Sequence, residues 1–143
     1  MYTAAYLLGK PVRISSMFNR TYAPAGDDNA VSVVEFENKA IAVLETSFVS
    51  PADAGCFELL GTKGALVSVA GQVKVRSTDF DVDGWVLIDR LPAALPMAMT
   101  QWFDGILKGT PIPYDTERAI ALTELLENAY KSDREQSIVK IER

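Results

Sequence analysis

Hydrophobic and polar residues alternate along three segments in the first part of the chain. These segments are 12–22, 30–37 and 40–48, and this period of two places successive side chains on opposite faces of a sheet. Only Asn38-Lys39 separates the last two segments. Two residues are the length of a hairpin turn, although Asn-Lys is a weaker turn sequence than Asn-Gly. We therefore expect these segments to be antiparallel strands.

Further strands are predicted in the middle of the chain. Residues 57–69 contain two apolar runs that meet at Gly61 and Gly64, which indicates a second hairpin, and shorter strands are expected at 72–78 and 85–89. The remaining clusters of turn residues are at 23–29 and 51–55. Strands that follow one another at intervals of roughly 8–12 residues are typical of an antiparallel meander.

Beyond Pro96 the hydrophobic period changes to about 3.6 residues, which predicts helices. The apolar face of the first predicted helix, 97–107, consists of Met99, Trp102, Phe103 and Ile106. The apolar face of the second, 116–130, consists of Ala119, Leu122, Leu126 and Ala129, with Leu125 beside them. Pro96 is a suitable start signal for the first helix, and Asp115 can cap the second.

A helix at 2–8 and a strand at 136–142 complete the predicted elements. Gly9 and Pro11 end the helix. No capping residue precedes Tyr2, and a helix that begins at the first residue predicts that the chain is part of a longer protein. The whole pattern predicts an α+β fold of one domain, residues 1–143, with a predominantly antiparallel open β-sheet (a meander) and helices packed on one face.

Composition narrows the classes of partner. The net charge is −5 and the basic residues are scattered, so we expect no nucleic-acid partner. No segment approaches the roughly 18 apolar residues that cross a membrane, so we expect no membrane insertion. Cys56 is the only cysteine, which excludes an internal disulfide, and we interpret it as a small apolar side chain at the start of a strand. These features fit a reducing cytoplasm.

The sequence contains one motif typical of a metal site. Asp79, Asp81, Asp83 and Gly84 have the spacing of a calcium loop. Position twelve of such a loop should be Glu, but it is Arg90 here, and strands rather than helices are predicted on both sides. We interpret this segment as an acidic turn and expect no metal ion.

Other catalytic motifs are missing from the sequence. There is no Gly-x-Gly-x-x-Gly for a dinucleotide and no histidine to activate a nucleophile. The candidate carboxylate pairs are Glu35 with Glu37 and Glu45 with Glu58, and charged residues on a half-solvated sheet explain them more simply than catalysis does. The residues alone do not indicate an independent enzyme.

Several segments, taken in order, resemble the C-terminal domain of the Gfo/Idh/MocA oxidoreductases, which act on sugars, inositols and related polyols. They are Leu8-Gly9-Lys10-Pro11-Val12, the hairpin 59–66, the Trp102 to Pro111 region, and the last helix and strand. The resemblance implies an N-terminal Rossmann domain, outside this chain, that binds NAD or NADP. That domain would carry the catalytic lysine of a Glu-Lys-Pro motif. No cofactor is expected in this chain itself.

The resemblance also implies site residues. In that family a His or Tyr meets the substrate hydroxyl near the start of the helix that ends in the Leu-Gly-x-Pro-Val stop, and counting back places Tyr2 at that position. Tyr2 is therefore implied as a catalytic residue of the parent protein, although the preceding Asp and Gly of the motif are not in this chain. Arg20 and Tyr22, at the end of the first strand, are implied as substrate-binding residues. The alternative for Arg20 is a solvent-facing charge at the sheet edge.

Strands 30–37 and 40–48 have apolar residues on both faces, whereas an antiparallel sheet with a free face alternates more regularly. A partner sheet would bury the second apolar face, and the family commonly pairs in this way, so we expect a homodimer through the open sheet face. The alternative is a deeper core within one chain.

These inferences predict the substrate-binding and dimerisation domain of an NAD(P)-dependent oxidoreductase that acts on a sugar, inositol or similar polyol and is inactive in isolation. A first alternative is a freestanding, non-catalytic binding or scaffold domain of the same fold. A second is an unrelated α+β ligand-binding module.

Overall fold

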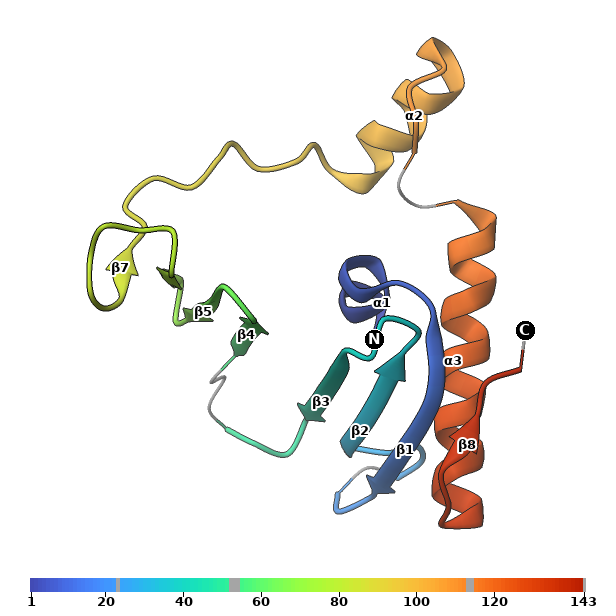
Figure 1. Cartoon of the computed structure of the whole chain (residues 1–143). Helices are drawn as coiled ribbons and strands as arrows, with labels where there is room; N and C mark the ends of the chain where they lie inside the picture. Colours follow the sequence, from blue (N-terminus) through green and yellow to red (C-terminus); the bar gives the residue numbers. More distant parts are fainter. Residues whose placement is uncertain (23, 52–54, 113–114, 143) are drawn as a thin grey trace. The chain divides into compact units, whose positions relative to one another are not determined.

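A computed structural model describes residues 1–22, 24–51, 55–112 and 115–142 (Figure 1). The chain divides into two compact units. The first consists of Met1–Ser50 together with Met97–Arg143, and the second is Pro51–Pro96. Two predicted turns are only partly covered, because Ala23 and residues 52–54 lie outside the described residues.

The first unit contains a sheet with the strand order β3-β2-β1-β8, in which all neighbours are antiparallel. Its elements are α1 (Tyr2–Leu8), β1 (Pro11–Asn19), β2 (Asn29–Phe36), β3 (Ile41–Ser47), α2 (Ala98–Lys108), α3 (Thr116–Glu135) and β8 (Val139–Lys140). The turn between β2 and β3 contains Asn38-Lys39, but it spans residues 37–40, because β2 ends one residue earlier and β3 begins one residue later than predicted. Lys39 adopts a left-handed φ of 69°, and the Asn38 side chain accepts a hydrogen bond from the Ala40 N–H at 3.0 Å. The Asn38 side chain thus compensates for the absence of glycine in this turn.

The second unit is a simple meander with the strand order β4-β5-β6-β7. Its strands are β4 (Cys56–Gly61), β5 (Gly64–Val69), β6 (Gln72–Ser77) and β7 (Val86–Leu87). Gly61 pairs with Gly64 across the predicted hairpin. The predicted α+β class with antiparallel sheets is confirmed, and the described strands are divided between two sheets.

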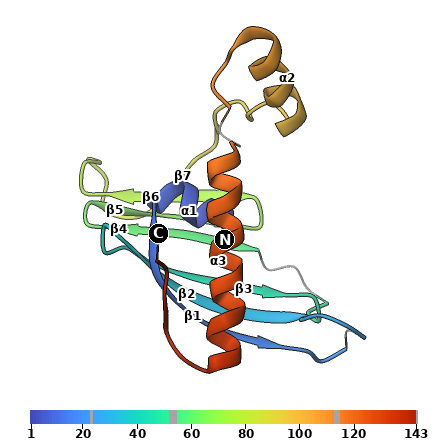
Figure 2. The same ribbon diagram turned by 90° about the vertical axis from the view of Figure 1, so that its right-hand side faces the viewer.

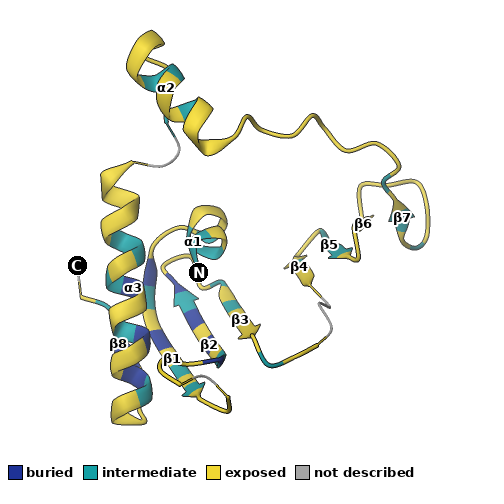
Figure 3. Cartoon of the chain, turned by 180° about the vertical axis from the view of Figure 1, so that it is seen from behind, coloured by how far each residue is buried: buried dark blue, intermediate teal, exposed yellow. Residues whose placement is uncertain are grey.

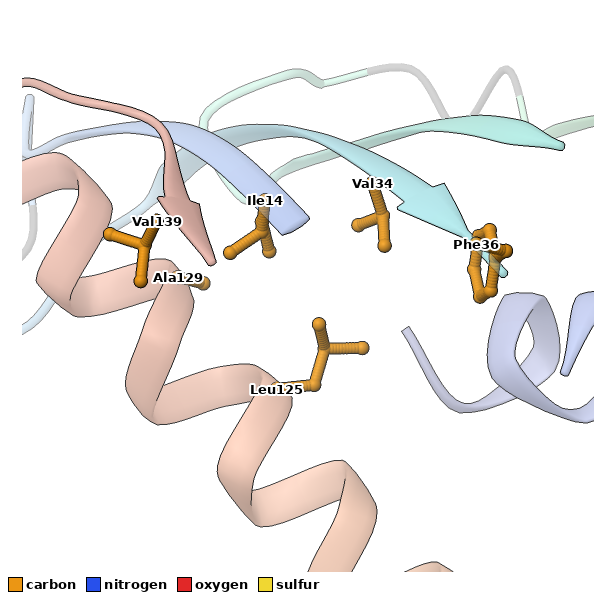
Figure 4. Close-up of a cluster of buried hydrophobic side chains, with 6 residues drawn as sticks. All are labelled: Ile14, Val34, Phe36, Leu125, Ala129 and Val139. Atoms are coloured by element: carbon orange, nitrogen blue, oxygen red, sulfur yellow. The ribbon is translucent and has the colours of Figure 1, made fainter. Parts of the chain in front are cut away.

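The core of the first unit lies between one face of the sheet and α3 (Figures 2 and 4). Its buried side chains are Ile14, Val34, Phe36, Leu125, Ala129 and Val139. Ala129 belongs to the predicted apolar face of this helix and Leu125 was expected beside that face, whereas Leu126, which was placed on it, is 40% exposed. The third fully buried position of α3 is Ser132, a polar residue that a hydrophobic pattern does not reveal.

The C-terminal end of α3 differs from the prediction. The helix continues to Glu135 instead of ending at Tyr130, and the final strand is only Val139–Lys140 instead of 136–142. Past the residues that pair with β8, the edge of β1 forms hydrogen bonds with side chains of α3. The N–H of Ser16 donates to Ser132 Oγ at 3.0 Å, and the N–H of Phe18 donates to Asp133 Oδ1 at 2.8 Å. Hydrogen bonds to these two side chains take the place of the backbone pairing that a longer final strand would have made with β1.

Helix α2 was predicted to cover the sheet together with α3. Only α3 does so, because none of the residues of α2 is buried (Figure 3). The predicted apolar face of α2 is present, but it is exposed.

Candidate functional site

Tyr2, the predicted catalytic residue, lies in the first turn of α1 and is half-buried. Residues four apart lie above one another on a helix, and the rings of Tyr2 and Tyr6 are stacked with their centroids 6.2 Å apart. Gly9, with a φ of 89°, ends the helix one residue after Leu8, as the sequence predicted. The sequence therefore places two phenol rings on the same side of α1.

The first turn of α3 contributes a cation to these rings. Asp115 caps the helix, because its Oδ1 accepts a hydrogen bond from the Arg118 N–H at 2.8 Å, and its Oδ2 lies 3.8 Å from Arg118 Nε. The Arg118 guanidinium carbon lies 5.3 Å from the centroid of the Tyr6 ring, within the range of a cation–π interaction. The cap therefore helps to hold the guanidinium against α1.

A cavity of about 330 Å³ lies between α1 and α3. Its polar and aromatic lining consists of Tyr2, Tyr6, Lys10, Arg118 and Glu124, and Pro11 and Ile141 also line it. Lys10 Nζ forms an ion pair with Glu37 Oε1 at 3.1 Å. The volume is at the lower end of the range for small-molecule sites. We call this cavity the Tyr2 pocket.

The Tyr2 pocket offers groups that suit a hydroxylated ligand. Phenol hydroxyls donate and accept hydrogen bonds, the two cations only donate, and a carboxylate only accepts. A polyol has hydroxyls that can pair with all three kinds of group. Tyr6, Lys10, Arg118 and Glu124 were not predicted as site residues, because the contact between the two helices is tertiary. Only the Tyr2/Tyr6 spacing could have been read from the sequence.

Arg20 and Tyr22 lie elsewhere. They follow the end of β1, whereas Tyr2 precedes its start, and the nine residues of the strand between them span about 30 Å. The Tyr22 side chain is 81% exposed, and its backbone N–H donates to Asp28 Oδ2 at 2.7 Å. The structure therefore does not bring Arg20 and Tyr22 to the Tyr2 pocket, and their role stays a separate prediction.

Two of the four candidate carboxylates, Glu35 and Glu37, are paired with cations. Glu35 contacts Arg13 and lies 3.9 Å from Lys39, and Glu37 is the partner of Lys10. These contacts agree with the simpler interpretation of charged residues on a partly solvated sheet.

The Asp79, Asp81 and Asp83 side chains are exposed in a turn between β6 and β7, and Asp83 lies 3.4 Å from Arg76. In the described part of the chain, no group of three or more acidic or thiol side chains is placed to hold a metal ion. Cys56 begins β4 as predicted, but it is exposed. None of the described helices is long and apolar enough to cross a membrane.

Comparison with known families bears on the N-terminal part of the chain, a little under half of its length. Residues 1–67 match the family described as the GFO/IDH/MocA C-terminal domain. This segment is therefore similar to the C-terminal domain of the Gfo/Idh/MocA oxidoreductases. It includes α1, the sheet strands β1–β3 and the hairpin at Gly61 and Gly64, so the predicted resemblance is confirmed there. The search of curated proteins found no match.

Solved structures extend the likeness in fold to the rest of the chain. An oxidoreductase from Agrobacterium radiobacter, in complex with NAD+, L-tartaric acid and magnesium, has a TM-score of 0.79 at 19% identity, over 96% of this chain and 45% of its own. An NAD binding oxidoreductase from Klebsiella pneumoniae has a TM-score of 0.80 at 16% identity, over 99% and 48%. Levoglucosan dehydrogenase, in complex with NADH and levoglucosan, has a TM-score of 0.75 at 19% identity, over 98% and 47%. The chain therefore spans less than half the length of these oxidoreductases.

Proposed function

We propose that this chain is the substrate-binding and dimerisation domain of an NAD(P)-dependent oxidoreductase that acts on a sugar, inositol or similar polyol. The observation that carries the proposal is the shared fold: nearly the whole chain matches less than half of proteins that are named as oxidoreductases. The parent protein would bind the dinucleotide in an N-terminal Rossmann domain and would reside in the cytoplasm. This chain alone would be inactive.

The proposed role of Tyr2 is proton transfer at the substrate hydroxyl. Its ring borders a pocket of ligand size, next to the side chains of Tyr6, Lys10 and Arg118. The pocket residues would bind and orient the hydroxyls of the polyol, while the absent domain would supply the hydride acceptor. Arg20 and Tyr22 would contact substrate only if the polyol or the parent protein reaches the far end of β1.

The test of the proposed function uses the protein from its source cells. An antibody against this domain should detect a protein two to three times heavier than 15.6 kDa. A native protein of 15.6 kDa would instead favour the freestanding binding or scaffold domain. The heavier protein, once purified, should reduce NAD or NADP in the presence of a polyol from a panel of sugars and inositols.

Substitution of Tyr2 then tests the site within that protein. Tyr2→Phe should lower kcat at least about 100-fold, because the phenol proton is lost while the ring remains. Tyr130→Phe is the matched control, since Tyr130 packs edge-on against Phe18 with centroids 4.8 Å apart and does not line the pocket. Equal activity of the Tyr2→Phe and Tyr130→Phe proteins would contradict the catalytic role.

The proposed dimer uses the sheet face opposite α3, which we call the outer face. Its exposed apolar residues are Met17, Val31, Val33, Ile41 and Val43. The register places Val31 beside Met17, and Val33 beside Val43, so these side chains form one continuous patch next to the Arg13–Glu35 ion pair. A second copy would cover this patch, because large exposed apolar patches are uncommon on monomers.

Val43→Glu in the 143-residue chain tests the dimer. Val43 is 68% exposed at the centre of β3, so the substitution should leave the fold intact and convert a dimer into a monomer. Ile120→Glu, at an exposed position of α3, should leave the dimer unchanged. Molar masses from light scattering distinguish the outcomes, and a monomeric unmodified chain at all concentrations would contradict the dimer.

A further inference from the structure

The charged side chains at the Tyr2 pocket do not balance. Lys10, Arg118 and Glu124 line the pocket. Each of the two cations also has a carboxylate partner, since Lys10 Nζ lies 3.1 Å from Glu37 Oε1 and Arg118 Nε lies 3.8 Å from Asp115 Oδ2. Two positive and three negative side chains therefore meet here, which gives the group a net charge of −1. In the described part of the chain, none of the other residues that line the pocket is charged.

Arg118 is held from two sides. The Asp115 carboxylate accepts a hydrogen bond from the Arg118 backbone N–H at 2.8 Å through Oδ1, and its Oδ2 faces the guanidinium. The centroid of the Tyr6 ring lies 5.3 Å from the guanidinium carbon. A ligand carboxylate that approached Arg118 would therefore meet a cation whose charge Asp115 already compensates. The same holds for Lys10, whose charge is compensated by Glu37.

Glu124 contributes the third negative charge, from the middle of α3. It is half-buried, whereas Lys10 and Arg118 are exposed. Charges that are partly shielded from water interact more strongly and are screened less by salt. We therefore expect Glu124 to repel a ligand anion more than the two compensated cations attract it. A carboxylate accepts hydrogen bonds, so the hydroxyl and ammonium groups of a ligand suit Glu124.

We propose that the Tyr2 pocket selects polyols by charge: it binds neutral and amino-substituted polyols and excludes sugar acids and sugar phosphates. This inference rests on the proposed function, because it concerns the polyol that the pocket would bind. Binding sites discriminate between ligands of similar shape by a repulsive group as well as by attractive ones. Like charges placed together cost enough to weaken binding at least about tenfold.

Three probes of matched shape test the selectivity. Glucitol is neutral, gluconate has a carboxylate at one end, and 1-amino-1-deoxyglucitol has an ammonium group there. Calorimetric titration of the native protein should give a Kd for gluconate at least about tenfold larger than the Kd for the amino polyol, with glucitol in between. Added salt should reduce this ratio, because salt screens charge. Gluconate that binds as tightly as the amino polyol would overturn the inference.

Asp115→Asn tests the contribution of the compensated cation. Asparagine is as good a helix cap as aspartate, so α3 is retained while one negative charge beside Arg118 is removed. The ratio of the gluconate Kd to the glucitol Kd should fall about fivefold. Glu117→Gln is the matched control, because it removes the same charge from the same helix turn at an exposed position that does not line the pocket. Equal changes of the ratio in the two variants would overturn the inference.

Glu124→Gln tests the half-buried carboxylate by a second route. The amide has nearly the same shape as the carboxylate and no charge, so the preference for the amino polyol over gluconate should be largely lost. An unchanged preference would overturn the role of Glu124, and with it the proposed charge selection.

A separate readout keeps this inference apart from the proposed function. Reduction of NAD or NADP by the native protein reports on the oxidoreductase and not on the charge preference. Preferential binding of the amino polyol without any reduction would retain the selectivity and contradict the redox role. Tight binding and oxidation of gluconate would do the reverse. Binding of none of the three probes would contradict both the substrate-binding role and the selectivity.

Discussion

The backbone N–H of Ser16 in β1 donates a hydrogen bond to the hydroxyl oxygen of Ser132 in α3, at 3.0 Å. The same hydroxyl donates to the carbonyl oxygen of Ser137 at 2.6 Å. One buried side chain thus connects the strand edge, the helix and the segment that leads to β8.

Ser132→Ala should therefore destabilise the first unit. The substitution leaves the Ser16 N–H and the Ser137 carbonyl without this partner, and such a loss costs about 1 to 3 kcal/mol. Thr123→Ala, on the exposed side of the same helix, should change the free energy of unfolding by less than about 0.5 kcal/mol. Urea unfolding followed by circular dichroism measures both, and equal values would contradict the role of Ser132.

Asp28→Asn should loosen the segment that contains Arg20 and Tyr22. The Asp28 carboxylate is buried and accepts hydrogen bonds from the N–H groups of Thr21 and Tyr22 at 2.7–3.0 Å. An amide has a single acceptor oxygen, so we expect a loss of about 1 to 3 kcal/mol and faster amide exchange at both positions. Asp27→Asn, at an exposed position, is the control. Equal amide exchange in the two variants would contradict the proposed role of the Asp28 carboxylate in holding this segment.

Gln136→Gly should stabilise the protein. Gln136 ends α3 with a φ of 52°, a left-handed conformation that glycine adopts without steric cost. We expect a gain of about 0.5 to 1 kcal/mol, whereas Glu135→Gly, one residue earlier and within the helix, should cost about 1 kcal/mol. Thermal unfolding of the two variants should give melting-temperature shifts of opposite sign. Shifts of the same sign would refute the explanation.

Gly64→Ala should disrupt the second unit. A Cβ at position 64 would lie 2.2 Å from the Arg76 carbonyl oxygen in β6, whereas a Cβ at Gly61 would lie 3.5 Å from the Gly64 carbonyl oxygen. Overpacking of this kind costs about 1 to 3 kcal/mol. Amide exchange in β5 and β6 should accelerate for Gly64→Ala and change little for Gly61→Ala. An undisturbed β5–β6 ladder in Gly64→Ala would contradict the predicted clash.

The sequence predicted the strands and helices whose hydrophobic period is regular. Strands β1–β6 and helix α1 lie within a few residues of their expected bounds, because alternation and turn residues determine them locally. The end of α3 was not predictable, since Ser132 and Asp133 interrupt the apolar pattern while bonding to β1. Likewise, Tyr2 was identified from its position in a motif, whereas Arg118 next to Tyr6 depends on how two distant helices meet.

The first unit is discontinuous in the sequence, and this has a consequence for the order in which the protein folds. Among the strands that the structure describes, β4–β7 pair only with their neighbours in sequence, so the second unit can form while the chain is still being synthesised. The core of the first unit joins Ile14 and Phe36 to Leu125 and Val139. The strands β1–β3, which are synthesised first, must therefore keep their apolar face uncovered until α3 and β8 have also been synthesised.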